Sequence, residues 1–293
     1  MRLAFWGILI FSFSFSFSQN LASNVYIFNL EALPNGMRAV HSPKLLTQFN
    51  SKGYNNQPFF INDHELLLTV KINGTSQTDI YKFNLNTNTR QQITKTSLSE
   101  FSPSVTSDMK SLSFVRVDDE ASALQRIYTA EYKLNSKINS PLPDIKNVGY
   151  YSWLDSKNVA LFLVNKPSQI ALVNTDTKDP LIFSSDIGRC MQSNTNGNLL
   201  YVHKITDEYW YIKEYDSINQ KANIVSETVK GSEDFAHLTD GEFIMAKDSK
   251  LYSIHPQTEK SWTEIADLSF FGIRNITRLA FNGGKLALVD QSK

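Results

Sequence analysis

A turn followed by a short apolar strand recurs six times along this chain, and it limits the possible folds more than any other feature. Each turn combines Asn, Asp or Ser with a following Asp, Ser or Gly. Asn, Asp and Gly tolerate the positive φ angles that tight hairpin turns require. Successive turns lie 41 to 48 residues apart, a period typical of propellers and other repeat folds. The turns are Asn62-Asp63, Ser107-Asp108, Asp155-Ser156, Asn196-Gly197, Asp240-Gly241 and Asn282-Gly283.

The segment after each turn has the pattern of a buried strand. These segments are five to seven residues long and rich in Leu, Val, Phe and Tyr, which is too short for helices and favours strands. They read ELLLTVK from Glu65, SLSFVRV from Ser111, VALFLV from Val159, LLYVHK from Leu199, FIMAK from Phe243 and LALVD from Leu286.

A further strand pattern follows the first five of these segments at a similar distance. Examples are DIYKFNLNTNT from Asp79 and KLYSIHPQTEK from Lys250, each ending in a polar turn. A last short strand comes next, such as RQQIT from Arg90 or TEIAD from Thr263. Each repeat therefore predicts four short antiparallel strands, which is the signature of a propeller blade.

The sixth repeat has only its first two strands, because the sequence ends soon after LALVD. Two strand patterns without a repeat of their own stand at the other end, in NVYIFNLEALPNG from Asn24 and MRAVHSPKLLT from Met37. Pairing them with residues 276–290 would complete the sixth blade and leave no open sheet edges in the ring. We therefore predict an all-β fold, a six-bladed β-propeller of four-stranded antiparallel blades, as a single domain over residues 19–293.

Residues 1–18, MRLAFWGILIFSFSFSFS, have a different character. A positive start at Arg2, an apolar stretch and small residues before Gln19 are the layout of a secretory signal peptide. An uncleaved membrane anchor is the alternative, although this stretch is shorter than a typical span. We expect an exported protein, periplasmic or at the cell surface. Cys190 is the only cysteine, so no disulfide can form within one chain, and we expect it to be a buried apolar residue.

Two segments carry a resemblance to a known family. QPFFIND (57–63) precedes Asp79-Ile80-Tyr81, and SPSVTSD (102–108) precedes Ile127-Tyr128. This pattern resembles the TolB-type, WD-related six-bladed repeat of exported bacterial proteins. The resemblance extends over roughly residues 24–290 and is sharp in residues 56–135. It implies a propeller that contacts other proteins of the cell envelope. TolB proteins carry an additional N-terminal α/β domain, for which we expect no room between Gln19 and the first strand near Val25, and this departure argues against a Tol–Pal role.

Motifs for common chemistries are missing from the sequence. The nucleophile pattern G-x-S-x-G, the zinc pattern H-E-x-x-H and the glycine-rich nucleotide loops do not occur, and the five histidines are scattered. Twenty-nine basic residues balance 29 acidic ones, so the basic surface expected of a nucleic-acid-binding protein is missing as well. We expect no nucleic-acid partner and no cofactor.

Propeller sites are often built from residues just before each innermost strand, which meet at the mouth of the channel. Mixed charge at these positions fits a solvated rim or a peptide-binding surface better than a metal cage, which needs several carboxylates. Tyr209-Trp210-Tyr211 could add an aromatic platform, although packing between blades is the favoured explanation. The candidate rim residues for ligand binding are Asn55, Asn56, Glu100, Tyr150, Arg189, Asp234, Arg274 and Asn275.

The sequence favours a non-catalytic propeller that binds a protein or small ligand through its top-face loops. The alternative is a hydrolase or lyase of the lactonase type at the channel mouth. It would use Glu100, Asp234 and His237, with a divalent metal ion. A structural subunit of an envelope assembly is a third interpretation.

Overall fold

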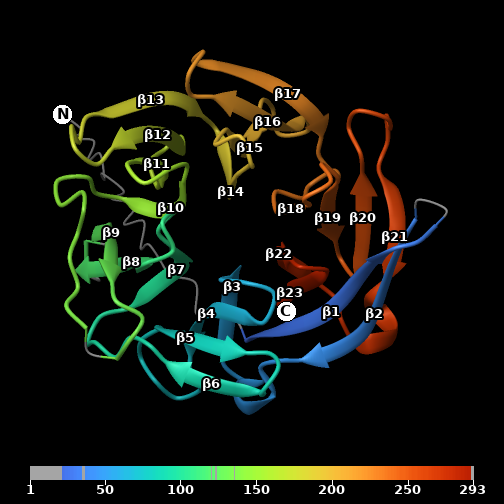
Figure 1. Ribbon diagram of the computed structural model, residues 1–293, viewed down its shortest axis with the longest axis horizontal. Coiled ribbons are helices and arrows are strands. Elements are labelled where there is room, and N and C mark those ends of the chain that lie inside the picture. The colour runs from blue at the N-terminus through green and yellow to red at the C-terminus, as the bar shows by residue number, and fades with distance from the viewer. Residues whose placement is uncertain (1–21, 35–36, 120, 123, 135, 292–293) are drawn as a thin grey trace, which may run out of the picture.

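The computed structural model describes residues 22–291 except 35–36, 120, 123 and 135, and these residues form a ring of six β-sheets (Figure 1). The predicted six-bladed propeller is confirmed. The two short 3-10 helices in this part of the chain are η1 (Gln48–Asn50) and η2 (Leu268–Phe271). The expected signal peptide, residues 1–18, lies outside the described residues. Over the described residues no helix is both long and apolar enough to cross a membrane.

Blades 1 and 2 follow each other along the chain. Blade 1 consists of β3 (Tyr54–Phe60), β4 (Glu65–Lys71), β5 (Asp79–Asn84) and β6 (Thr89–Gln92). Blade 2 consists of β7 (Glu100–Val105), β8 (Leu112–Asp119) and β9 (Leu124–Ala130). In place of a fourth strand, blade 2 has a single antiparallel bridge between Thr129 and Asn139.

Blades 3 to 5 each contain four strands in chain order. Blade 3 consists of β10 (Val148–Trp153), β11 (Asn158–Leu163), β12 (Gln169–Asn174) and β13 (Pro180–Ser185). Blade 4 consists of β14 (Ile187–Ser193), β15 (Leu199–Lys204), β16 (Trp210–Asp216) and β17 (Lys221–Glu227). Blade 5 consists of β18 (Phe235–His237), β19 (Phe243–Lys247), β20 (Lys250–Ile254) and β21 (Thr263–Asp267).

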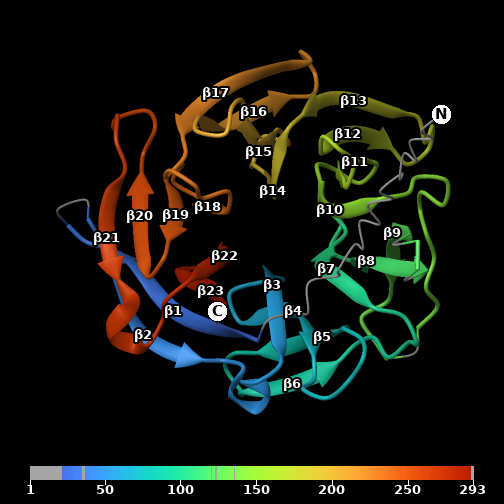
Figure 2. The same ribbon diagram turned by 180° about the vertical axis from the view of Figure 1, so that it is seen from behind.

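Blade 6 is shared by the two ends of the chain, as the incomplete sixth repeat predicts. Its order is β22 (Ile276–Asn282), β23 (Lys285–Gln291), β1 (Ser23–Ala32) and β2 (Arg38–Leu45). β1 pairs antiparallel with β23 from Ser23 opposite Gln291 to Asn29 opposite Lys285. In Figures 1 and 2 the blue and red strands lie side by side in this sheet. The ring is therefore closed by hydrogen bonds between its first and last strands.

The second strand of each blade has apolar residues at successive positions because both of its faces are covered. In β4, Leu66, Leu68 and Val70 pack against blade 6, whereas Leu67 packs against blade 2. Alternate side chains of a strand point to opposite faces, so a strand between two neighbouring sheets needs apolar residues on both. The continuous apolar runs in the sequence follow from this two-sided burial.

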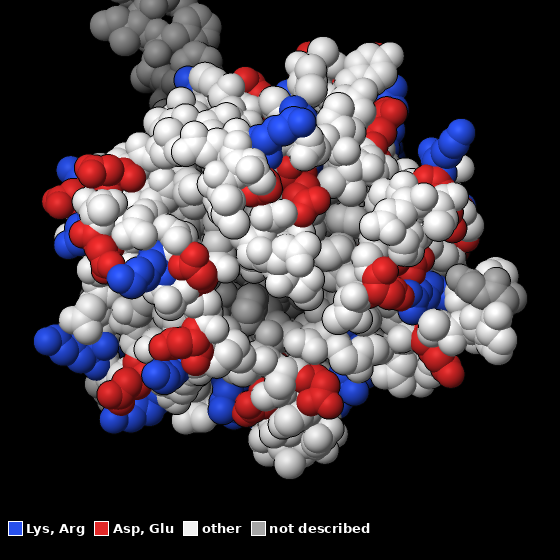
Figure 3. Space-filling model, turned by 45° about the horizontal axis from the view of Figure 1, so that its top comes forward, with Lys and Arg blue, Asp and Glu red and all other residues white. Residues whose placement is uncertain are grey.

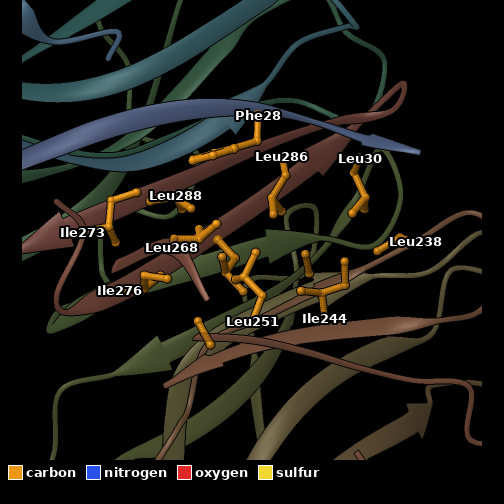
Figure 4. Packing of buried hydrophobic residues seen from close by; sticks show 13 residues of the cluster. Phe28, Leu30, Leu238, Ile244, Leu251, Leu268, Ile273, Ile276, Leu286 and Leu288 are labelled. Atoms are coloured by element: carbon orange, nitrogen blue, oxygen red, sulfur yellow. The ribbon is translucent and has the colours of Figure 1, made fainter. Parts of the chain in front are cut away.

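The buried side chains of the described residues form six clusters, one in each interface between neighbouring blades. Figure 4 shows the cluster between blades 5 and 6. There Phe28 and Leu286 of blade 6 belong to the same cluster as Ile244 and Leu251 of blade 5. The propeller thus has a core distributed around the ring, rather than a single central core.

The innermost strands β3, β7, β10, β14, β18 and β22 all begin at the same face of the ring, which we call the top face. The paired register of Ile187 with His203 shows that the loops between second and third strands are also at this face. The six turns that mark the repeat connect first and second strands, so they lie at the opposite face. The top face is therefore where the candidate rim residues were expected.

Candidate functional site

The six innermost strands surround a central channel that contains a cavity of about 380 Å³. Side chains from all six blades line it, and most of them are polar. They include Gln57, Ser102, Tyr150, Arg189, Gln192, Asp234, His237 and Arg278.

A buried ion pair crosses between blades 5 and 6 in this channel. Arg278 of β22 lies 3.2 Å from a carboxylate oxygen of Asp234, and both side chains are about nine-tenths buried. The other oxygen of Asp234 accepts a hydrogen bond of 2.7 Å from the backbone N–H of Leu279. Arg278 also donates to the Tyr150 hydroxyl of blade 3 at 2.8 Å, across the channel. One guanidinium therefore connects three blades.

Electrostatic attraction keeps Arg278 charged in spite of its burial. Burial lowers the pKa of the Arg278 guanidinium, but Tyr150, Asp234 and Tyr54 outweigh this effect and raise it above its ordinary value. Burial also raises the pKa of the Tyr54 hydroxyl, so this phenol stays neutral. The channel mouth thus contains a fixed cation among two tyrosines and one carboxylate.

A second cavity of about 250 Å³ opens at the top face between blades 4, 5 and 6. We call it the rim pocket and define it by Arg189, Lys204, Trp210, Glu233 and Thr277. Glu233 lies between two cations, with Oε1 3.1 Å from Arg189 Nε and Oε2 2.6 Å from Lys204 Nζ. Burial raises the pKa of Glu233, but the attraction of Arg189 and Lys204 outweighs burial, so the pKa is lowered overall.

The rim pocket and the channel cavity share part of their walls. Arg189, Asp234, Arg278 and Leu279 line both of them. On the outer side of the rim pocket, Lys204 Nζ lies 4.3 Å from the centre of the Trp210 ring, a cation–π contact. An extended ligand could therefore reach from Trp210 at the rim into the channel and stay in contact with the protein along its whole length.

The opposite wall of the channel is closed by a chain of hydrogen bonds across blades 1, 2 and 3. The Gln57 side chain donates to the Ser102 hydroxyl at 3.1 Å and accepts from the Ser102 backbone N–H at 2.8 Å. Ser102 in turn donates to the Gly149 carbonyl at 3.1 Å. Because these polar groups satisfy one another, this wall is structural.

His237 lies deeper in the channel, on the side of blades 4 and 5. Gln192 fixes the local backbone, since it donates to the Phe235 carbonyl at 2.6 Å and accepts from the His237 N–H at 3.2 Å. The His237 ring packs on Phe243 at 4.6 Å between centres. Burial lowers the pKa of His237, so its ring is neutral near pH 7.

The structure brings four of the eight candidate rim residues together. Tyr150, Arg189 and Asp234 meet around Arg278 in the channel cavity. Asn275 joins Arg189 and Asp234 in the wall of the rim pocket. Arg274 is exposed and donates to the carbonyls of Ser269 and Ile273, so it holds the loop before β22.

The other three candidates do not reach the rim. Asn55 and Asn56 are buried, and Asn55 donates to the Ser23 and Asn50 carbonyls, which joins blade 1 to the closing strand β1. Glu100 is 0% exposed and lies in the seam between blades 1 and 2. There Thr94 donates to Glu100 at 3.1 Å, and Thr96 also donates to it. The expectation that Glu100 lines the channel mouth is not met.

Arg278 and Lys204 are site residues that the sequence analysis missed. Arg278 is the third residue of its innermost strand, as Arg189 and Tyr150 are of theirs. A comparison of third positions among the six innermost strands would have identified Arg278. Lys204 ends a second strand and gives no such signal.

Among the described residues, no group of three or more His, Cys, Asp or Glu side chains is placed to hold a metal ion. Figure 3 shows acidic and basic side chains interspersed over the face in view, with no large region of one sign. This distribution agrees with the balanced charge of the sequence.

Comparison of the chain with known proteins gives matches at the level of structure. No protein-family model and no curated protein matches its sequence. A protein described as a TolB from Agrobacterium tumefaciens superposes with a TM-score of 0.65 at 11% identity, over 93% of this chain and 99% of that one. TolB from Acinetobacter baumannii superposes with a TM-score of 0.58 at 14% identity, over 93% of this chain and 64% of that one.

An enzyme of the same fold is also similar. Oligogalacturonate lyase from Vibrio parahaemolyticus superposes with a TM-score of 0.52 at 11% identity, over 92% of this chain and 98% of that one. At such identities the likeness is one of fold. The TolB-type propeller architecture expected from the two sequence segments is therefore confirmed, and function must be argued from the site.

Proposed function

We propose that this protein is a non-catalytic, exported binding protein that holds a segment of a partner protein at its top face. The observation that carries the proposal is the rim pocket at blades 4 to 6, which continues into the channel cavity through Arg189, Asp234 and Arg278. Concave sites with a few fixed polar groups are the usual form of binding sites. The leader expected at residues 1–18 and the likeness to TolB propellers support a place in the bacterial cell envelope.

Apolar side chains exposed on the same face favour a protein over a small ligand. Val164, Ile205 and Tyr209 are each about half exposed, and they stand at the top of blades 3 and 4. Protein interfaces combine exposed apolar anchors with a polar rim. This face offers both within neighbouring blades.

Site-specific photo-crosslinking in cells of the source organism tests the proposal. A photoreactive phenylalanine replaces Tyr209 at the top of blade 4, and in a matched variant it replaces Ile218. Ile218 is 90% exposed in the turn between β16 and β17, at the opposite face of the same blade. We expect a discrete crosslinked protein from position 209 and none from position 218. Equal products from both positions, or products from 218 alone, would contradict the proposal.

The alternative function is a lyase or hydrolase at the channel mouth with a divalent metal ion, which the likeness to oligogalacturonate lyase favours. Burial raises the pKa of Asp234, as a general acid requires, but both of its oxygens are already engaged by Arg278 and Leu279. Glu100 does not line the channel cavity that Asp234 and His237 share. Metal analysis of the purified protein tests this alternative: a stoichiometric divalent ion that is lost in Asp234→Asn would favour the enzyme.

A further inference from the structure

The rim pocket contains more hydrogen-bond donors than its own acceptors satisfy. The basic residues in its wall are Arg189, Lys204, Lys247 and Arg278, and the acidic ones are Glu233, Asp234 and Asp248. Asp234 is occupied by Arg278 and Leu279 N, and Asp248 is exposed. Glu233 is therefore the partly buried acceptor left to balance both Arg189 and Lys204.

Two buried polar atoms at this pocket have no hydrogen-bond partner. Arg189 Nε lies 3.1 Å from Glu233 Oε1, but its N–H bond does not point along this contact, so the ion pair leaves the donor unsatisfied. The Thr277 hydroxyl is buried and unpaired as well. The two residues are in direct contact, because Arg189 Nη2 donates a hydrogen bond of 3.3 Å to the backbone carbonyl of Thr277. Unpaired buried polar groups cost free energy. Five other such atoms occur elsewhere among the described residues, so these two point to a ligand only together with the excess positive charge of the rim pocket.

We infer that the rim pocket binds a carboxylate of the partner polypeptide, which accepts hydrogen bonds from Arg189 and Thr277 beside Lys204. This inference rests on the proposed function and names the chemistry that its site recognises. With Glu233 between them, Arg189 and Lys204 leave one positive charge, which matches a singly charged carboxylate better than a phosphate dianion. A side-chain carboxylate of Asp or Glu would let the rest of the segment continue into the channel cavity.

Two peptide libraries provide the probe. Both contain acetylated, amidated hexapeptides of mixed sequence that differ at one position, which is Glu in the first library and Gln in the second. Retention on the immobilised protein is measured for each, with acetate as a competing free acid. We expect the Glu library to be retained about tenfold more strongly, the effect of one charge-assisted hydrogen bond. Weak competition by acetate would show that the peptide chain contributes to binding.

Three variants test whether the preference for the Glu library arises in the rim pocket. Arg189→Gln, Lys204→Gln and Thr277→Val should each reduce the ratio of Glu to Gln retention toward one. Thr277→Val keeps the shape of the side chain and removes an unpaired hydroxyl, so its stability to urea should be no lower than that of the wild type. Lys157→Gln is the control, since Lys157 pairs with Asp176 in an exposed bridge outside the pocket.

Equal retention of the two libraries by the wild type would overturn the carboxylate inference. A preference for Glu that all three variants retain would overturn it too, because the binding would lie elsewhere. Neither result affects the photo-crosslinking at Tyr209, which tests the top face independently. The two proposals can therefore fail separately.

Discussion

At the scale of single residues, Arg278 links the site to stability. Its guanidinium bridges Asp234 and Tyr150 inside the channel. Replacement of Arg278 by Met should lower the free energy of unfolding by about 3–5 kcal/mol, because Asp234 would remain buried without its cation. Urea unfolding measures the loss.

The matched control for this prediction is Lys157→Met, which removes one partner of the exposed pair with Asp176 and should leave stability nearly unchanged. The double variant Arg278→Met/Asp234→Asn should recover part of the loss, because the isolated charge is gone. If Arg278→Met is as stable as the wild type, the Arg278–Asp234 pair does not stabilise the fold.

Glu100 predicts how stability depends on pH. Burial raises the pKa of Glu100 to about 7, with a further increase from Asp79, whose own pKa burial raises to about 6. Arg116, Thr94 and Thr96 oppose the shift. Between pH 4.5 and 7 the folded state therefore keeps a proton on Glu100 that the unfolded state has already released. The stabilisation from this bound proton is complete below pH 4.5 and is lost as the pH rises through 7.

Replacement of Glu100 by Gln should remove most of this decline and raise stability at pH 8 by about 2–3 kcal/mol. The amide oxygen can accept from one of the two threonine hydroxyls as before, and the amide NH2 can donate to the other hydroxyl once that hydroxyl turns to accept, so no charge is buried. Thermal melts between pH 4.5 and pH 8 measure the slope, and a smaller slope from Asp79 should remain. Glu131→Gln is the control, because Glu131 is an exposed residue paired with Lys133. An unchanged slope in Glu100→Gln would refute the assignment.

The sequence placed Glu100 and Asn55 at the rim because both stand at the start of an innermost strand. Whether such a residue faces the channel or the seam between blades depends on local register. Asn55 is the second residue of β3 and Glu100 the first of β7, whereas Tyr150 and Arg189 are the third residues of their strands. Register shifts occur near the start of the innermost strand in blades 1, 2, 3, 4 and 6, and the sequence carries no clear mark of where each one falls. Tyr150, Arg189 and Asp234 were predicted on the same ground as Glu100 and Asn55, and their side chains do line the channel cavity.

At the scale of elements, β1 completes blade 6 and contributes to the interface with blade 5. Phe28 of β1 is fully buried in that cluster, and its ring lies 5.7 Å from that of Phe271. Phe28→Ala should lower the free energy of unfolding by about 3–5 kcal/mol through the cavity it leaves. Phe270, one residue from that contact, is 90% exposed.

Chemical unfolding of Phe28→Ala and Phe270→Ala compares the two positions directly. Phe270→Ala should unfold at nearly the wild-type urea concentration. Equal effects of the two substitutions would mean that Phe28 adds little to the packing of β1 against blade 5. The paired measurement thus isolates this packing contribution.

Most elements could be predicted from the sequence, because each strand between two blades must be apolar on both faces and each hairpin needs a turn residue. β4, β15 and β19 have the bounds of their apolar runs. The fourth strand of blade 2 was expected from the period and is reduced to the Thr129–Asn139 bridge. Residues after Ala130 mix polar and apolar side chains, as the outer strand β17 does, so neither the repeat nor the composition could reveal this difference.

At the scale of the whole molecule, the chain ends of the ring are adjacent, since Ser23 pairs with Gln291. A circular permutant that runs from Asn219 to Gln291, then through a short Gly/Ser linker from Ser23 to Ile218, should therefore fold into the same propeller. Its circular dichroism spectrum and cooperative unfolding should match those of the wild type. A permutant opened between Tyr201 and Val202, inside β15, should not fold. A failure of the first permutant would show that the ends are not joined as the pairing indicates.

The shared blade also sets an order in time. β1 leaves the ribosome, or any secretion pore, long before β23, which is its neighbour in the finished sheet. Until that late strand arrives, β1 has a bare edge able to capture strands from other chains. The propeller can therefore close only after β23 has been synthesised, and until then a chaperone can bind the unpaired edge of β1.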